Sequence, residues 1–266
     1  MDAPLPAPAT KHVAALQHAL PRSELVLTLR QRTATADGRD TGTTGTTLWL
    51  GGQVLAAYLA SLPPSPGAAV ELGAGVGFLA LSLAAAGHDV LATDVEPVLS
   101  AVLAPNLDAG VRVLGGAGVP ARATPALLDW VEVADALAAG RAPFANLDPG
   151  AAAHIARADT LVTTDTLYAP HLIQPLWATL AAMCAGRDRP PAVYLALERR
   201  DPRLVDAGLD GGREAGFELR RIAHGRVVKA LDRAGWRWAP EDWAGVEVWR
   251  AKWRGEAREA AGPGGA

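Results

Sequence analysis

Val70-Glu71-Leu72-Gly73-Ala74-Gly75-Val76-Gly77 is the stretch that decides the fold of this chain of 266 residues. The short apolar run over residues 68–72 predicts a buried strand, and the run over about 78–86 predicts a helix. The three glycines therefore lie where a strand passes into a helix. Glycine adopts backbone angles closed to other residues and lets a ligand approach the main chain closely. In open α/β sheets, loops of this kind at strand carboxyl ends bind ligands.

The spacing of the glycines distinguishes between two cofactors. A dinucleotide fingerprint requires a glycine at the sixth position counted from Gly73, and that position is Phe78. Glycines at the first, third and fifth positions instead indicate a loop around S-adenosylmethionine, which has no pyrophosphate to place at a helix N-terminus. The alternative is a tight turn that binds nothing.

Asp94 supports a nucleoside-containing cofactor. It ends the next predicted strand, residues 89–93, which follows the glycine loop. A carboxylate at this place can accept hydrogen bonds from both hydroxyls of a ribose. The alternative is that Asp94 only caps the helix that begins near Glu96-Pro97.

Strands and helices alternate along most of the chain. The predicted strands cover residues 24–30, 68–72, 89–93, 126–128, 160–164, 192–197, 217–222 and 246–253. The predicted helices cover residues 13–20, 48–62, 78–86, 96–109 and 171–185, with a further helix from 201 and a break at Pro105. This alternation predicts an α/β fold with a doubly wound, largely parallel sheet, helices on both faces and the last two strands as an antiparallel pair at one edge, with little helix between them.

One domain accounts for the length of the chain. We expect a partly disordered lead over residues 1–21, with residues 1–11 disordered, a folded domain over 22–253 and a disordered tail over 254–266. The Gly/Pro-rich stretches 111–122 and 138–152 are predicted to be surface insertions.

The composition argues against several classes of partner. A net charge of −3, from 25 basic and 28 acidic residues, provides no general attraction to nucleic acid or to an anionic membrane. Arginines cluster around Arg199 to Arg203 and around Arg213 to Arg226. These clusters are interpreted either as a solvated face or as a surface that binds an acidic partner. Cys184, the only cysteine, lies in an apolar run and is predicted to be a buried structural thiol. We expect a soluble, cytoplasmic monomer without a metal site.

Four further motifs occur in an order that is found in one family. They are Thr47-Leu48-Trp49, Thr93-Asp94, Leu128-Asp129-Trp130 and Asp165-Thr166-Leu167-Tyr168. With the glycine loop, these motifs make residues 22–253 resemble the seven-β-strand protein-lysine methyltransferases of the methyltransferase-16 group. The resemblance is greatest to fungal members that act on translation elongation factors.

The resemblance implies a class I, Rossmann-like fold with a seven-stranded sheet, and S-adenosyl-L-methionine as the cofactor. It implies that Trp49 lines the cofactor pocket and that Asp94 holds the ribose. Glu71 and the three glycines, Gly73, Gly75 and Gly77, would hold the methionine portion. Asp129 and Trp130 would lie beside the adenine. Asp165 and Tyr168 would face the substrate amine as the catalytic pair.

The expected function is therefore methylation of a lysine on a folded protein, such as a translation elongation factor. Three alternatives remain open from the sequence: a histidine or small-molecule acceptor, a cofactor-binding protein without activity, and an oxidoreductase that uses NAD. Simple structural roles also remain open for the site residues. Trp49 and Trp130 can be core residues, Asp165 a helix cap and Tyr168 an interface residue.

Overall fold

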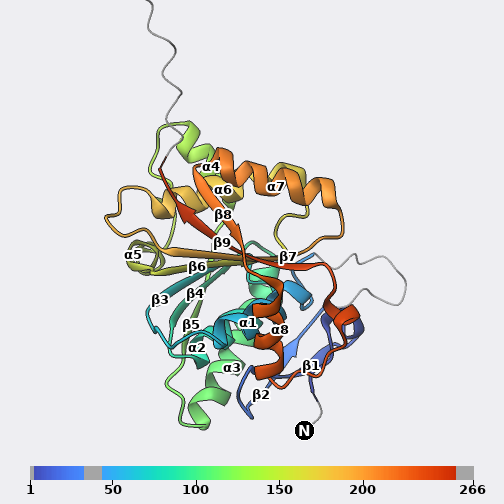
Figure 1. The fold of residues 1–266 in the computed structure, drawn as a ribbon. Coiled ribbons are helices and arrows are strands. Elements are labelled where there is room, and N and C mark those ends of the chain that lie inside the picture. Colours follow the sequence, from blue (N-terminus) through green and yellow to red (C-terminus); the bar gives the residue numbers. More distant parts are fainter. Residues whose placement is uncertain (1–2, 33–43, 256–266) are drawn as a thin grey trace, which may run out of the picture.

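The computed structural model describes residues 3–32 and 44–255, which form a central sheet between two layers of helices (Figure 1). The strands are β1 (Ala15–Ala19), β2 (Val26–Arg30), β3 (Ala68–Leu72), β4 (Asp89–Asp94), β5 (Arg122–Leu127), β6 (Thr160–Thr164), β7 (Ala192–Glu198), β8 (Phe217–Arg221) and β9 (Val246–Trp253). The helices are α1 (Leu50–Ala60), α2 (Phe78–Ala85), α3 (Ala104–Gly116), α4 (Trp130–Ala138), α5 (Pro149–Arg157), α6 (Pro170–Cys184), α7 (Pro202–Glu214) and α8 (His224–Arg233).

The central sheet has seven strands in the order β5-β4-β3-β6-β7-β9-β8. Strands β3 to β7 pair in parallel, and β9 pairs antiparallel with both β7 and β8. The chain runs outward from β3 to β5 and then crosses back to β6, so the order reverses between β3 and β6. The prediction of a doubly wound, mostly parallel sheet with an antiparallel edge is confirmed. The carboxyl ends of strands at such a reversal form a crevice for ligands.

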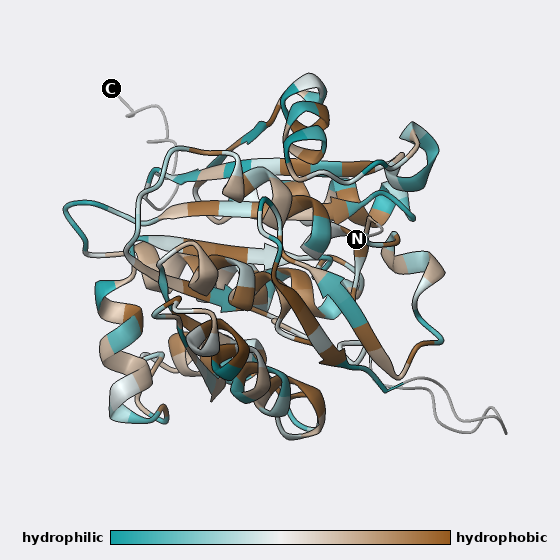
Figure 2. Cartoon of the chain, turned by 90° about the horizontal axis from the view of Figure 1, so that it is seen from below, coloured by the Kyte–Doolittle hydropathy of each residue, from teal (hydrophilic) through white to brown (hydrophobic). Residues whose placement is uncertain are grey.

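The two helix layers bury two apolar clusters. Helices α1, α2, α3 and α8 cover one face, with Phe78 and Leu55 fully buried among them. Helices α4 to α7 cover the other face around Trp177, whose indole N–H donates to the backbone oxygen of Gly208. In Figure 2 the central strands carry mostly hydrophobic residues, whereas the outer helices alternate between hydrophobic and hydrophilic ones. Among the described residues, no helix is long and apolar enough to cross a membrane.

The N-terminal segment differs from the prediction. Residues 13–20, predicted as a helix, instead contain strand β1 (Ala15–Ala19), which pairs with β2 in a two-stranded sheet of its own. Leu16 and His18 point inward at alternate positions, which is the period of a strand. Residues 3–11 are also ordered, against the expected disorder, because the side chain of Gln53 bonds the backbone of Leu5 and Ala7. Residues 1–2, and residues 256–266 of the tail predicted as disordered over 254–266, lie outside the described residues, and the domain limits stay a prediction.

Several elements differ in extent from those predicted. The helix predicted over 96–109 is a π-helical turn, Leu99–Leu103, followed by α3, which continues to Gly116. Pro105 directly follows this π-helical turn, and the residues before it, Leu103 and Ala104, are themselves helical, so the helix is irregular at the proline rather than ended by it. The stretch 111–122 is therefore partly helix. The stretch 138–152 contains Asp148, which caps α5. The prediction of little helix between β8 and β9 is wrong, because α8 lies there.

Candidate active site

The glycine loop follows β3 at the point where the strand order reverses. Gly73 and Gly75 have φ angles of +68° and +55°, which other residues rarely adopt. A Cβ on Gly73 would lie 2.9 Å from Cγ2 of Thr166, and one on Gly75 would lie 2.9 Å from the backbone oxygen of Gly45. Glycine is therefore required at both positions for two reasons: the positive φ angle, and the neighbouring atoms that would clash with a Cβ. Gly77 packs against Leu107 and lines none of the pockets described below.

Asp94 joins the end of β4 to the glycine loop. Its Oδ2 accepts a hydrogen bond from the Gly75 N–H at 2.8 Å, and its Oδ1 accepts one from the Val95 N–H at 2.8 Å. Burial raises the pKa of the Asp94 carboxyl, and these two hydrogen bonds oppose that rise. Each oxygen keeps a second lone pair that can accept from a ligand.

A pocket of about 330 Å³ opens beside this loop, and we call it the glycine-loop pocket. It brings together six of the residues proposed from the sequence: Gly73, Asp94, Asp129, Trp130, Asp165 and Tyr168. Thr44, Gly45, Thr166 and His171 also line it and were missed by sequence reasoning. Thr166 lies inside the Asp165-to-Tyr168 motif, which is the signal that could have identified it.

Asp129 and Trp130 form one wall of the glycine-loop pocket. Oδ1 of Asp129 caps α4 by accepting from the Val131 N–H at 2.8 Å. The Trp130 indole lies over Gly73, since a Cβ on that glycine would be 3.3 Å from two of its ring carbons. The wall therefore offers a carboxylate oxygen and an aromatic surface side by side.

Asp165 ends β6 with a φ of +53°, an uncommon angle for a residue with a side chain. Its Oδ2 accepts from the Gly51 N–H at 2.8 Å, in the first turn of α1, and its Oδ1 accepts from the Glu198 N–H at 3.0 Å, at the end of β7. Burial raises the pKa of Asp165 to about 6. A buried carboxyl with this pKa can accept a proton near neutral pH.

A second pocket of about 240 Å³ lies on the other side of Asp165, and we call it the Trp49 pocket. Its lining includes Trp49, Asp165, Tyr168, Glu198 and Arg200. The two pockets share Thr44, Asp165 and Tyr168. Trp49, expected beside the cofactor, lines the Trp49 pocket and not the glycine-loop pocket. Tyr168 is 49 % exposed.

Glu71 lies behind the glycine loop rather than in either pocket. It is only 1 % exposed, and its Oε2 accepts no hydrogen bond from any described residue. Burial raises the pKa of this carboxyl well above its ordinary value, although the backbone N–H of Ala80 opposes the rise. The neutral acid is therefore favoured beneath the loop.

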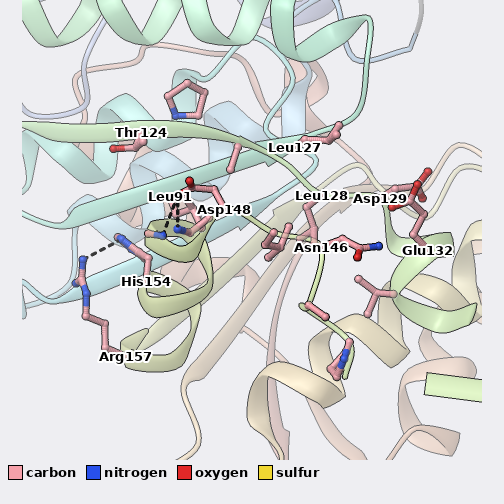
Figure 3. Close-up of a pocket in the computed structure, with 18 of the residues that line it drawn as sticks. Leu91, Thr124, Leu127, Leu128, Asp129, Glu132, Asn146, Asp148, His154 and Arg157 are labelled. Carbon is pink, nitrogen blue, oxygen red and sulfur yellow. Dashed lines mark hydrogen bonds between the residues drawn. The ribbon is translucent and has the colours of Figure 1, made fainter. Parts of the chain in front are cut away.

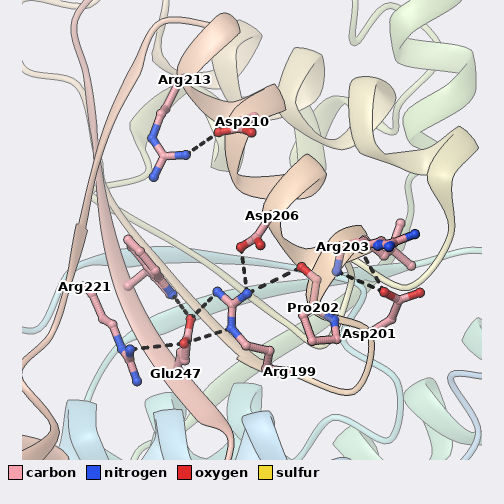
Figure 4. Close-up of polar contacts among 11 residues, drawn as sticks. Arg199, Asp201, Pro202, Arg203, Asp206, Asp210, Arg213, Arg221 and Glu247 are labelled. Atoms are coloured by element: carbon pink, nitrogen blue, oxygen red, sulfur yellow. Dashed lines mark hydrogen bonds and ion pairs between the residues drawn. The ribbon is translucent and has the colours of Figure 1, made fainter.

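An arginine–carboxylate network supports the far wall of the Trp49 pocket (Figure 4). The Arg199 guanidinium donates to both oxygens of Glu247, at 3.0 and 3.1 Å, and to Asp206 at 2.7 Å. Asp201 caps α7 by accepting from the Arg203 and Leu204 N–H groups. The network joins β7, β9 and α7, so it holds the strand end that carries Glu198 and Arg200. Sequence reasoning missed Glu247, which nothing in its local motif distinguishes.

A larger cavity than these two lies elsewhere, in a groove of about 1060 Å³ beside β5, α4 and α5 (Figure 3). The stretch 138–152 forms part of its lining, and it shares only Leu128 and Asp129 with the glycine-loop pocket. Three of its polar residues form a chain of contacts: His154 bonds the Ala69 carbonyl and Arg157, and Arg157 pairs with Asp89 at 2.8 Å. Neither Asp165 nor Tyr168 lines this groove.

The strand order and the glycine loop define the fold as that of class I S-adenosylmethionine-dependent methyltransferases. A family model described as lysine methyltransferase, of the methyltransferase-16 group, matches residues 29–206. The chain belongs to that family.

Solved structures of methyltransferases are similar to the chain. A putative S-adenosylmethionine-dependent methyltransferase from Streptococcus mutans has a TM-score of 0.50 and 9 % identity, over 90 % of this chain and 55 % of that chain. The magnesium protoporphyrin IX methyltransferase of Synechocystis PCC 6803, solved with bound SAH, has a TM-score of 0.39 and 18 % identity, over 75 % of this chain and 80 % of that chain. A search of curated proteins found no match.

The cofactor is S-adenosylmethionine, and the residues of the site fit it. Gly73 lines the glycine-loop pocket with its backbone alone, whereas Gly75 does not line the pocket and holds Asp94 through its N–H. Asp94 and Asp129 supply acceptor oxygens, and Trp130 supplies an aromatic surface. These are the groups that hydroxyls, an amine and a purine ring require. The protein is an S-adenosylmethionine-dependent methyltransferase.

Proposed function

We propose that the protein transfers a methyl group to the side-chain amine of a lysine on a protein substrate. The observation that carries the proposal is the meeting of two pockets at Asp165 and Tyr168. A methyl donor on one side and an acceptor side chain on the other would meet at these residues. Membership of the lysine methyltransferase family supports the same acceptor.

The glycine-loop pocket is the proposed cofactor site. We assign the ribose hydroxyls to Asp94 and the methionine portion to the backbone of Gly73 and Gly75. The exocyclic amine of the adenine would donate a hydrogen bond to Oδ2 of Asp129, and the adenine ring would pack on the Trp130 indole. Glu71 and Gly77 would not contact the cofactor and would instead support the conformation of the glycine loop. When bound, S-adenosylmethionine supplies an electrophilic methyl group on a sulfonium.

The Trp49 pocket is the proposed acceptor site. The Trp49 ring and the exposed ring of Tyr168 can flank the methylene chain and the cationic head of a lysine. The amine must be neutral to act as a nucleophile, and Asp165 lies where it can orient the amine and accept its proton, directly or through water. Placement of the amine supplies most of the rate enhancement, on the order of 7–11 kcal/mol for a well-oriented pair.

The pocket opens beside an exposed tyrosine, which suits an amine presented on the surface of a folded protein. The motifs of the chain point to a translation elongation factor as the substrate, and we propose that the enzyme acts on such a protein in the cytoplasm. No partner other than the protein substrate is proposed, and we expect the enzyme to act as a monomer.

A labelling assay tests the proposal. The purified protein is incubated with methyl-labelled S-adenosylmethionine and an extract of cells that lack it, because unmethylated substrate accumulates there. We expect a labelled protein band whose modified residue, identified by mass spectrometry, is lysine. Asp165→Asn should abolish the label, and the exposed carboxylate variant Asp188→Asn should not. Label found only in small molecules, or on histidine, would show that the acceptor is wrongly assigned.

A further inference from the structure

Lys11 contacts Trp49, the aromatic residue that lines the Trp49 pocket. Its Nζ is 3.5 Å from the centroid of the Trp49 ring, and the guanidinium carbon of Arg200 is 4.4 Å from the same centroid. The chain contains only three lysines: Lys11, Lys229 and Lys252. One of the three therefore places its amine against an aromatic residue of the proposed acceptor pocket.

The backbone around Lys11 is held by hydrogen bonds, which place the Cα of Lys11 close to Trp49. Nε2 of Gln31 donates to the carbonyls of Thr10 and Val13, at 3.0 and 2.8 Å, on either side of Lys11. Oε1 of the same amide accepts from the Leu48 N–H at 2.6 Å, directly before Trp49. Gln31 is 3 % exposed. One buried amide thus holds the turn that carries Lys11 beside the residue that it contacts.

Electrostatics around Lys11 match those expected at an acceptor site. Partial burial and the neighbouring Arg200 cation lower the pKa of the Lys11 amine, while the carboxylates of Glu198 and Asp165 oppose this effect. The amine lies within the electrostatic reach of Asp165, the proposed proton acceptor. A lowered pKa increases the fraction of neutral, nucleophilic amine at physiological pH.

We propose that Lys11 is a methylation site of the protein itself, modified within the same molecule. The inference rests on the proposed lysine methylation, because it uses the same pocket. The lone pair of the Lys11 nitrogen forms a bond to the methyl carbon as the bond from that carbon to sulfur breaks, and the electron pair stays on sulfur to leave S-adenosylhomocysteine. The proton lost by the nitrogen passes to Asp165 or to water. The methylated nitrogen can regain its charge and stay over the Trp49 face.

Mass spectrometry of the purified full-length chain tests the proposal. After incubation with S-adenosylmethionine that carries a deuterated methyl group, label should appear on Lys11 and not on Lys229 or Lys252. Asp165→Asn, expressed in parallel, should stay unmodified and shows which methyl groups were added during expression. Lys11→Arg should lose the self-label and still bind the cofactor in calorimetry. The rate per molecule should not change with protein concentration.

The same preparation, incubated with the extract described above, separates the two proposals. Label on an extract protein without label on Lys11 would overturn self-methylation and leave the proposed function intact. Label on Lys11 with no labelled protein in the extract would support self-methylation and contradict the proposal that the enzyme acts on another protein. No label in either reaction would overturn both. A rate that rises with protein concentration would show transfer between molecules and contradict the intramolecular step.

A second measurement does not depend on activity. The three lysines can be reductively methylated with ¹³C-formaldehyde and observed by NMR, where the Trp49 ring should shift the Lys11 signal upfield of the other two. Trp49→Leu should return that signal to the position of Lys229 and Lys252. Coincident signals in the unmodified sequence would show that Lys11 does not lie on the ring and would overturn the proposal.

Discussion

Asp165 joins three elements through one side chain while it lines both pockets. Its two oxygens accept from α1 and from the end of β7, and its own backbone ends β6. Both oxygens are thus engaged before any ligand binds. The carboxyl is a structural group at the centre of the site, and its burial gives it the raised pKa that a proton acceptor requires.

This burial predicts the way in which stability depends on pH. The pKa of Asp165 rises from 3.8 in the unfolded chain to about 6 in the folded protein, so the folded state binds the proton more tightly. Its contribution to the free energy of unfolding is therefore favourable below pH 4 and is lost as the pH rises to about 6. The loss is on the order of 3 kcal/mol, at about 1.4 kcal/mol per pKa unit.

Asp165→Asn removes this titration. Relative to the unmodified protein, the variant should gain stability between pH 4 and pH 7, because it carries no buried charge at the higher pH. Urea unfolding of both proteins at the two pH values measures the difference, and all other titrating groups are common to both. A difference that stays constant with pH would show that the carboxyl is not buried as described.

Asp94 yields a prediction on binding. Asp94→Asn keeps the shape of the side chain and removes the charge, so hydrogen bonds from the cofactor hydroxyls should weaken. We expect cofactor affinity to fall by about 10- to 100-fold, since hydrogen bonds to charged groups contribute about 1.5–3 kcal/mol. Calorimetry measures the affinity. Asp89→Asn, at the opposite end of β4, is the matched control and should bind as the unmodified protein does; equal losses in both would remove Asp94 from the pocket.

Asn106 connects elements that are far apart in the sequence. From α3, its amide accepts from the Arg30 N–H at 2.7 Å and donates to the carbonyls of Arg30 and Val76, each at 2.9 Å. The side chain is 3 % exposed. It therefore ties the end of β2 to the glycine loop and bonds both backbone groups of Arg30.

Asn106→Ala should destabilise the protein, because three backbone groups would lose their partner in a buried place. The expected loss in the free energy of unfolding is about 1–3 kcal/mol. Urea unfolding measures it, with Asn146→Ala as the control. Asn146 is exposed in the loop before α5, and its replacement should change the free energy of unfolding by less than about 0.5 kcal/mol. An equal effect in both variants would argue against the bridging role of Asn106.

Helices and strands whose apolar residues recur with one clear spacing were predictable from the sequence. Those with an unclear spacing of apolar residues were not. β3, α2 and β4 lie where they were predicted. Two apolar runs separated by a glycine loop fit a strand followed by a helix and no other arrangement. Residues 13–20 fit either period, and only burial against α1 and α2 makes them a strand. Helix α8 buries only Val227, Ala230 and Leu231, so its pattern is faint.

The same reasoning explains the site. Asp94, Asp129 and Asp165 each follow a parallel strand, so the topology alone brings them to one edge. The place of Trp49 could not be derived, because it depends on how residues 44–49 cross the carboxyl ends of β6 and β7. Lys11 was missed for a different reason: it lies in the turn before β1, within residues 1–11, which the sequence predicts as disordered.

At the scale of the whole molecule, the N-terminal segment and the loop after α8 form a joint cover over α1 and α2. The indole N–H of Trp238 donates to the Pro4 carbonyl at 2.6 Å, across 234 positions of sequence. His18 of β1 packs against Phe78, at 4.2 Å between ring centroids, and against Trp236, at 5.4 Å. The N-terminal segment is therefore part of the folded core, and it is the segment that places Lys11.

Acidification should loosen this cover through His18. Burial lowers the pKa of His18 from 6.5 to about 4 in the folded protein, so the folded state resists protonation. Its contribution to stability is complete above pH 6.5 and is lost as the pH falls towards 4, by on the order of 3 kcal/mol. This change is opposite in sign to that of Asp165 over nearly the same pH range, so the two partly cancel in the unmodified protein.

His18→Gln separates the two contributions, because glutamine does not titrate and can still bond Gln53. Compared with the unmodified protein, the variant should gain on the order of 2–3 kcal/mol between pH 7 and pH 4.5. Urea unfolding measures this gain, and hydrogen exchange should show that the amides of β1 and β2 lose protection first in the unmodified protein at pH 4.5. His12→Gln, an exposed histidine on the same segment, should show neither effect. Equal behaviour of the two variants would mean that the cover is not held by a neutral, buried imidazole.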